Sequence, residues 1–373
     1  MSRPKRDKLD SWIFDTYEVS KEGLGLLRMA ASMFIFFFLL PGNGLDHFYY
    51  LSSLPTEFYN PPPGPLSLLN SFPSEWVFIT IFAIAIVSLG LLFVGLFTKT
   101  SSILAGLSIL ALQGLVFSVG KVNHEIMLPL VPLFMAFSNW GAAYSMDAKF
   151  RKEEQEVESW PLVLLSLFIA FMMLTAGIPK ILGGWLDPST QAVKGHVLNQ
   201  YIVKDRDALL AGMVMNFDVP LFWEILDYAT IVFEVGFIAA MFRAGSFRFF
   251  LIIAVVFHFS TQLLMNIAFL PNFLAYSVFL QWSRIHDGLI HIQKRVKGSG
   301  GPDIEKAAIR NAVIGLGIFF AIVKWISLQK IFFRNSDLSL HEFILITMAL
   351  IVVLFISIRF IRKKYSELNV AVD

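Results

Sequence analysis

Long apolar segments separated by short polar connections occupy most of the 373-residue chain. A helix needs about 20 mostly apolar residues to cross the hydrocarbon layer of a bilayer. Ten segments approach that length, near residues 24–41, 76–97, 101–119, 124–140, 160–178, 221–242, 247–265, 267–282, 311–328 and 341–358. The 124–140 and 267–282 segments are short and could be tilted, re-entrant or interfacial. The pattern predicts an all-α fold, a polytopic transmembrane helix bundle of about 8 to 10 spans, without a soluble domain.

The composition favours a membrane environment. Hydrophobic residues make up 56% of the chain and charged residues only 16%. Soluble domains are about half apolar and about a quarter charged, so a soluble fold could not bury this much apolar surface. The expected partner is therefore the lipid bilayer, and the net charge of +2 argues against a nucleic-acid partner. The chain has no Cys and its His residues lack zinc-site spacing, so we expect no metal.

Basic residues predict the orientation of the spans, because cytoplasmic loops collect Lys and Arg. The N-terminal segment, the 283–310 loop and the C-terminal tail are rich in both, whereas the 42–75 connection has neither. We therefore expect an integral protein of a bacterial inner membrane with both termini in the cytoplasm. The expected divisions are a cytoplasmic N-terminal segment at 1–23, a membrane domain at 24–285, a basic cytoplasmic loop at 286–310, and two C-terminal transmembrane helices with a basic tail at 311–373.

The 179–220 connection breaks this charge pattern, because it lies outside and yet carries Lys180, Lys194, Lys204 and Arg206. Lys180 directly follows Pro179 at the end of a long apolar segment, and we expect Pro179 to disturb the last helical turn. A Lys held partly away from water has a lowered pKa and can act as a base. The alternative is a Lys that snorkels to the membrane surface beside an interfacial Trp185.

Two further groups of polar residues lie at membrane depth, where a charge costs about 2.5 kcal/mol or more and therefore indicates function. Asn123 and His124 precede the fourth apolar segment, where His124 could bind a ligand or form part of a helix cap. Glu234 lies deep in the 221–242 segment, so it must be protonated or paired. Glu224 and Asp227 share its helix face nearer the outer end, where we expect them to be hydrated.

The next segment carries a polar stripe, because His258, Gln262 and Asn266 follow one another at intervals of four. Such residues either line a site or hydrogen-bond between helices. We expect Glu234 and His258 to lie within hydrogen-bonding reach, directly or through water, since both are costly alone in hydrocarbon. Arg28 and Lys324 also lie in apolar segments, but each is close enough to an end to snorkel, so we assign them no role.

Three stretches of the chain resemble the HTTM membrane domain, a fold shared with vitamin K-dependent γ-glutamyl carboxylase. Their order and spacing along the chain carry the resemblance. The stretch 177–185 resembles the carboxylase segment whose Lys deprotonates vitamin K hydroquinone. Phe257-His258 with Gln262 resembles its later His-bearing helix, and Val122 to Glu125 resembles its Asn-His segment. The resemblance covers roughly residues 20–285. After Trp282 the chain differs from the carboxylase, so the resemblance does not extend to peptide carboxylation.

The resemblance implies a stand-alone HTTM protein that acts on or with a quinol or other lipophilic small molecule in a cavity facing the extracytoplasmic side. The cofactor would be a quinone or hydroquinone, vitamin K-like or menaquinone, with Lys180 as the base. The catalytic residues would be Lys180, His124, His258 and Glu234, and the quinol would be bound by Asn123, Trp185, Gln262 and Asn266.

Two other functions stay open from the sequence, which does not decide whether the chain is an enzyme. One is a non-enzymatic membrane factor in the maturation, export or immunity of a peptide or toxin, with a peptide substrate or a membrane protein as partner. The other is a small-solute or proton-coupled transporter, in which Glu234 and His258 would form the proton relay. A transporter often shows an inverted repeat with broken helices, and the sequence shows none.

Overall fold

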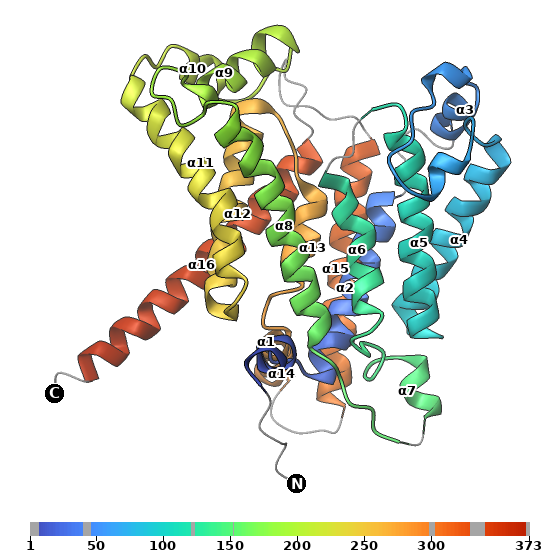
Figure 1. Ribbon diagram of the computed structural model, residues 1–373. Helices are drawn as coiled ribbons and strands as arrows, with labels where there is room; N and C mark the ends of the chain where they lie inside the picture. Colours follow the sequence, from blue (N-terminus) through green and yellow to red (C-terminus); the bar gives the residue numbers. More distant parts are fainter. Residues whose placement is uncertain are drawn as a thin grey trace. The chain divides into compact units, whose positions relative to one another are not determined.

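The computed structural model describes residues 7–39, 46–120, 124–151, 153–297, 303–328 and 340–370. All the regular structure in these ranges is helical (Figure 1), which confirms the predicted all-α fold. The chain forms two compact units. Unit 1 comprises Met1–Phe168 and Leu274–Lys324, and unit 2 comprises Ile169–Phe273 and Trp325–Asp373.

Six helices in the described ranges are long and apolar enough to cross a membrane. They are α2 (Lys21–Leu39), α4 (Glu75–Val94), α5 (Thr98–Phe117), α8 (Trp160–Leu182), α12 (Ala244–Met265) and α15 (Ile304–Leu328). Two other predicted segments are also helices, α11 (Pro220–Ala240) and α16 (Leu340–Val370). The remaining two contain only short helices, α6 (Met127–Met135) and α13 (Leu270–Ser277), which at about 1.5 Å per residue are too short to cross alone.

The connections contain shorter helices. These are α1 (Lys8–Asp15), α3 (Asp46–Ser52), η1 (Thr56–Phe58), η2 (Pro65–Leu68), η3 (His124–Ile126), α7 (Met146–Phe150), α9 (Ala192–Leu198), η4 (Asn199–Val203), α10 (Ala211–Met215) and α14 (Trp282–Lys297). Helix α14 lies where the sequence predicted only a basic loop. Its apolar residues recur on one face, which can pack against neighbouring helices. The prediction of a loop considered only the charges of the segment and not this periodicity.

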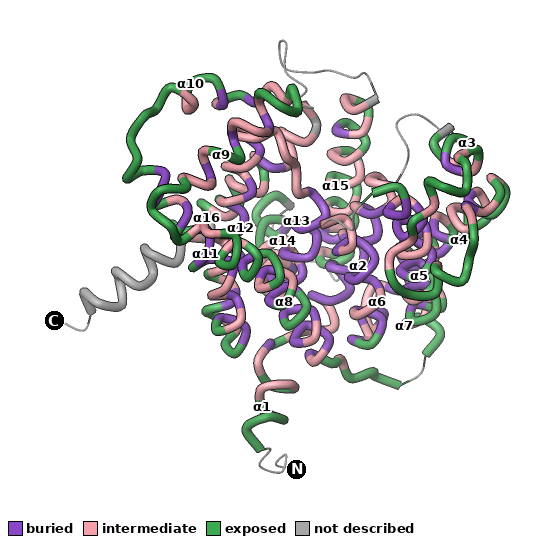
Figure 2. Tube along the Cα trace, turned by 45° about the horizontal axis from the view of Figure 1, so that its top comes forward, coloured by how far each residue is buried: buried purple, intermediate pink, exposed green. Residues whose placement is uncertain are grey.

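In unit 1, helix α2 packs against α4, α4 against α5, and α5 against α6. The buried face of α2 runs along much of its length (Figure 2). Small and hydroxyl residues allow these helices to approach closely, as in other membrane helix pairs. Gly106 of α5 lies directly against Leu133 of α6, and Ser102 donates a hydrogen bond of 2.6 Å to the carbonyl of Pro132.

Arg28 of α2 does not snorkel, contrary to the prediction, because its side chain is completely buried. It donates to backbone carbonyls at the end of α4, namely Leu92 and Phe93 (2.6 Å to Phe93). It also donates to the carbonyls of Trp140 (3.2 Å) and Tyr144 (2.6 Å). Carbonyls at a helix C-terminus carry partial negative charge and have no partner within the helix, so they suit a buried guanidinium.

Asp147 completes this part of unit 1. Its carboxylate accepts hydrogen bonds from the backbone N–H groups of Phe97 (2.9 Å) and Thr98 (2.7 Å) at the start of α5, and from the Thr98 hydroxyl. Burial alone would raise the pKa of Asp147, but these hydrogen bonds and the charge of Arg151 outweigh it and lower the pKa. The turn between α4 and α5 is thus held by the Arg28 guanidinium at the end of α4 and by the Asp147 carboxylate at the start of α5.

In unit 2, the 179–220 connection is a folded element rather than an open loop. Val193 and Val197 of α9 pack with Ala208, Ala211 and the fully buried Trp223 of α11. The indole N–H of Trp223 donates to the carbonyl of Phe217 at 2.9 Å. This apolar cluster holds the connection against α11, directly beyond the end of α8.

Candidate functional site: a Lys–Glu ion pair between helices α8 and α11

Lys180 and Glu234 form an ion pair between α8 and α11. The Lys180 amine lies 2.6 Å from each of the two carboxylate oxygens of Glu234. The side chain of Glu234 is 6% exposed and that of Lys180 is 23% exposed. The predicted need of Glu234 for a partner is therefore met by Lys180. In the described structure, the hydrogen bonds that the Glu234 carboxylate accepts come from Lys180 and not from His258, the partner that we expected.

A glycine explains why the two helices come close enough for this pair. Gly177 precedes Lys180 by about one turn on α8 and faces α11. A Cβ atom at Gly177 would lie 3.0 Å from Val235 Cγ2 and 3.2 Å from Glu234 Cβ, which is tighter than most real Cβ contacts. With a larger residue here, the side chains of Val235 and Glu234 would have to shift by a few tenths of an ångström.

Pro179 does not break helix α8, contrary to the prediction. The helix continues through Pro179 to its last residue, Leu182, and Gly184 beyond it adopts the left-handed conformation (φ +82°). The N–H of Trp185 then donates to the carbonyl of Lys180 at 3.1 Å, as at a glycine-terminated helix end. Lys180 is thus held in the last regular turn, where its amine also lies 3.3 Å from the carbonyl of Ala176.

Trp185 and His196 lie beside the ion pair. The Lys180 amine lies 5.3 Å from the centre of the Trp185 ring, within the range of a cation–π contact. The His196 ring of α9 lies 5.2 Å from the same indole. Partial burial lowers the pKa of His196, the charges of Lys180 and Lys204 lower it further, and Asp227 opposes them. His196 therefore favours the neutral form near neutral pH, in which it can both donate and accept a hydrogen bond.

Asp227 fixes α9 and with it His196. Asp227 is completely buried, and its two carboxylate oxygens accept hydrogen bonds of 2.7 Å from the N–H groups of Ala192 and Val193. These are the first N–H groups of α9, which have no partner within the helix. The expectation that Asp227 and Glu224 are hydrated was wrong, because both are buried. The carboxylate oxygens of Glu224 have no hydrogen-bond partner among the described residues.

The polar stripe on α12 contacts neighbouring residues of unit 2. His258 is buried, stacks on Phe269 with ring centres 4.2 Å apart, and lies 3.4 Å from the side-chain nitrogen of Asn272. Asn266 ends α12 in the left-handed conformation (φ +51°) and donates to the carbonyl of Asp207 at 3.3 Å. Gln262 is fully buried and lies 3.4 Å from Asn266. These contacts match the structural alternative, while the binding roles of Gln262 and Asn266 stay predictions.

The family comparison extends over both units. The family model of the HTTM domain matches residues 18–283, well over half of the chain. The chain belongs to the HTTM-domain family. No curated protein and no solved structure matches the sequence significantly.

Within this HTTM domain, the predicted site residues fall in different units. Lys180, Trp185, Glu234 and the α12 stripe belong to unit 2, whereas His124 belongs to unit 1, in η3. Asn123 lies outside the described residues. The structure therefore brings Lys180, Glu234 and Trp185 together, and the role of His124 stays a prediction.

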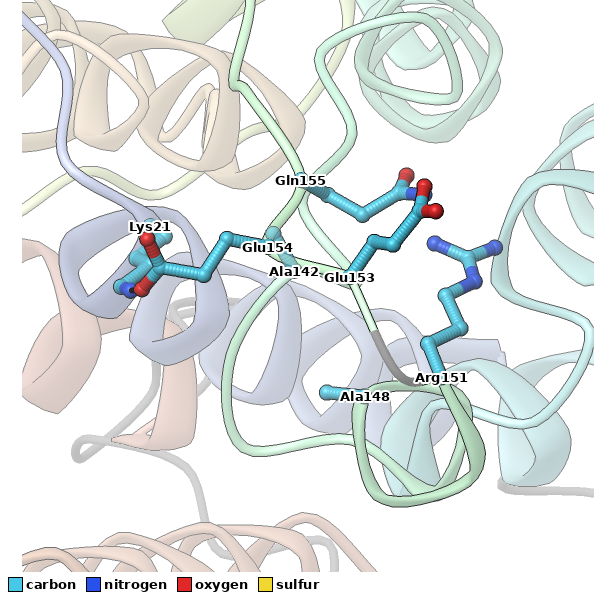
Figure 3. Close-up of a pocket in the computed structure, with 7 residues that line it drawn as sticks. All are labelled: Lys21, Ala142, Ala148, Arg151, Glu153, Glu154 and Gln155. Atoms are coloured by element: carbon cyan, nitrogen blue, oxygen red, sulfur yellow. Dashed lines mark hydrogen bonds and ion pairs between the residues drawn. The ribbon is translucent and has the colours of Figure 1, made fainter.

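A pocket elsewhere in the HTTM domain has a different character. It lies in unit 1 and is lined by Lys21, Ala142, Ala148, Arg151, Glu153, Glu154 and Gln155. Figure 3 shows its acidic and basic side chains next to one another, and Lys21 pairs with Glu154 at 2.5 Å. Its charges largely compensate one another, so it shows no preference for a charged ligand. Across the described residues, no group of three or more His, Asp or Glu side chains is arranged to hold a metal ion.

His196 and the cap formed by Asp227 are the parts of the site that the sequence did not reveal. His196 lies in a connection whose helices are short, and its position depends on a carboxylate from a different helix. The residue before α9 is Gln191, which is not a typical N-cap residue, so no local signal marks the start of the helix. The Asp227 carboxylate takes that place from α11.

Proposed function

We propose that this HTTM protein binds a lipophilic quinol at the outer end of α8 and removes a proton from it through Lys180 and Glu234. The observation that carries the proposal is the ion pair with 2.6 Å contacts between the two side chains, placed beside the Trp185 indole. A quinol is weakly acidic and apolar, so it partitions into the bilayer and needs a base held partly away from water. Trp185 offers a flat surface on which an aromatic ring can stack.

The ion pair constrains the chemistry, because a base must be neutral and a carboxylate neighbour favours the ammonium form of Lys180. In the proposed step, Lys180 gives one proton to Glu234 and accepts the hydroxyl proton of the quinol. The products are a quinolate anion, an ammonium on Lys180 and a protonated Glu234, so no proton is gained or lost. The ammonium then stabilises the quinolate, as positive groups stabilise charge that develops during catalysis.

The ion pair favours this proposal over the transporter. The transporter required a relay between Glu234 and His258, whereas both oxygens of Glu234 are bound by Lys180. A non-enzymatic membrane factor would use the same pair only to hold α8 against α11. The two roles differ in what they require of Lys180, because a purely structural cation can be replaced by Arg.

Replacement of Lys180 tests the proposal. Menaquinol, kept reduced without oxygen, is added to the purified protein at pH 8, and bound quinolate is followed by its absorbance. We expect Lys180→Arg and Lys180→Met to bind menaquinol but to lose at least about tenfold in quinolate, since Arg does not give up its proton in this range. Lys194→Met is the matched control, because Lys194 lies on α9 and pairs with the exposed Asp218.

If Lys180→Arg forms as much quinolate as the wild type, the base role is wrong and the non-enzymatic function takes its place. If Lys180→Met does not fold, the comparison rests on Lys180→Arg, which keeps the positive charge beside Glu234. Mass spectrometry of the lipids that co-purify with the wild type would identify the natural quinol or show a different ligand.

We also propose that both termini lie in the cytoplasm, on the strength of the basic residues in the N-terminal segment, the 283–310 region and the C-terminal tail. The chain has no native Cys, so single Cys residues can report the orientation. Ser53→Cys, at an exposed position beyond α3, should react with a membrane-impermeant thiol reagent added to intact cells. Ser2→Cys should react only after the cells are opened, and the reverse pattern would refute the orientation.

A further inference from the structure

Helix α14 (Trp282–Lys297) is too polar to cross a bilayer, yet it directly precedes the apolar helix α15. One face of α14 packs on the rest of unit 1. Leu289 and Trp282 join an apolar cluster with Leu26 and Met29 of α2 and with Ile309 of α15. The approach is close at the first residues of α2, because a Cβ atom at Gly23 would lie 2.8 Å from the Ser283 nitrogen. Figure 1 shows α14 at this end of α2.

Polar contacts fix the same face of α14. The buried His286 ring lies 2.7 Å from the Tyr144 hydroxyl, which also donates to Glu305 of α15. Gln293, also buried, accepts a hydrogen bond of 3.3 Å from Asn311 of α15. The helix therefore has a fixed rotation about its own axis, and its outer residues point in defined directions.

The outer surface of α14 has two different sides. One side adjoins the packed face and carries Ile292 and Val296, about one turn apart, with exposed fractions of 61% and 75%. Arg284 and Arg295, about three turns apart and both exposed, border this apolar stripe. The other side carries the exposed residues Asp287, His291 and Lys294. Apolar residues bordered by Arg are typical of a helix that lies in a membrane surface.

We propose that the Ile292–Val296 side of α14 lies in the surface layer of the bilayer and that Arg284 and Arg295 bind the phosphates of anionic phospholipids. Three observations support a lipid occupant. The helix packs at the start of the apolar helix α2 and directly precedes α15, so it is held where a span begins. Its exposed apolar side chains form a narrow stripe on one side. The two groups along one edge of the stripe are guanidinium ions, which bind phosphate oxygens in pairs and can snorkel from an apolar side.

The proposal predicts that two neighbouring basic residues contribute differently to lipid binding, and the experiment compares them. Arg295 and Lys294 are adjacent and carry the same charge, but only Arg295 borders the apolar stripe. Binding of phosphatidylglycerol and of phosphatidylcholine to the purified full-length protein is measured by native mass spectrometry. We expect Arg295→Gln to bind phosphatidylglycerol about fivefold more weakly, and the double variant with Arg284→Gln about twenty-five-fold, at about 1 kcal/mol per basic residue.

Lys294→Gln is the matched control and should bind both lipids like the wild type. Ile292→Ser with Val296→Ser should also weaken phosphatidylglycerol binding, because the acyl chains lose their contact. If this apolar double variant is unchanged and inorganic phosphate competes with the lipid, the site is for free phosphate and the proposal is wrong. Equal losses for Lys294→Gln and Arg295→Gln would also overturn it, because net charge alone would then explain the binding. Thermal unfolding checks that each variant is folded.

Discussion

Replacement of Arg28 by Met is expected to destabilise unit 1 more than the removal of any exposed charge. The guanidinium is completely buried and donates to four backbone carbonyls, of Leu92, Phe93, Trp140 and Tyr144. Met fills a similar volume but donates no hydrogen bond, so the carbonyls of Phe93, Trp140 and Tyr144 would lose the donor that Arg28 provides, while that of Leu92 keeps the N–H of Gly95. Each buried group without a partner costs about 1–3 kcal/mol, and we expect a total loss of at least about 3 kcal/mol.

Thermal unfolding of the purified protein, followed by tryptophan fluorescence, measures this effect. Arg243→Met is the matched control, because Arg243 is exposed at the start of α12. Arg28→Lys should fall between the wild type and Arg28→Met, since a single amine cannot reach all the acceptors of a planar guanidinium. A melting temperature of Arg28→Met equal to that of Arg243→Met would show that the carbonyls find other partners.

The second large effect is an asymmetry between the two members of the ion pair. Lys180→Met would leave Glu234, with its 6% exposed side chain, as an unpaired buried carboxylate. Removal of one member of a buried pair costs roughly 3–5 kcal/mol, and the lower end applies here because Lys180 is 23% exposed. Glu234→Met should cost less, since the Lys180 amine still reaches the Ala176 carbonyl and solvent.

The double variant Lys180→Met with Glu234→Met should be more stable than Lys180→Met alone, because no charge then remains buried. The same unfolding measurement on the wild type, the two single variants and the double variant gives the coupling energy of the pair. Losses that simply add would mean that the two side chains do not interact in solution. Such a result would also remove the structural basis of the proposed proton transfer.

The sequence shows which buried charges need a partner, but it does not show which residue that partner is. The length and apolarity of the segments predicted the helices, and the cost of a charge in hydrocarbon identified Glu234 and Lys180. The partner of Glu234 could not be predicted, because helical periodicity fixes the face of a residue but not which neighbouring helix it faces. Gly177 of α8, which lies directly against α11, has no local pattern around it that marks a close approach of two helices.

Arg28 and Asp227 show a second limit of the sequence. Both satisfy backbone groups that are distant in the chain, such as the carbonyls of Leu92 and Tyr144 and the N–H of Ala192. The sequence shows a charged residue near the end of an apolar segment, and snorkelling or hydration is the usual outcome there. Only the folded chain reveals that unpaired helix ends lie within reach. Buried charges that serve helix ends are therefore easily mistaken for surface residues.

The absence of a side chain at Gly177 has a consequence for the energetics of the ion pair. The atoms nearest to Gly177 belong to the side chains of Val235 and Glu234, so the α8 backbone lies directly against the base of the Glu234 side chain. This contact restricts the rotamers open to Glu234, so less of its side-chain conformational entropy remains to be lost when the pair forms. A molecule that enters beside Lys180 meets charges that are already oriented, and little reorganisation energy is required when a proton moves between them.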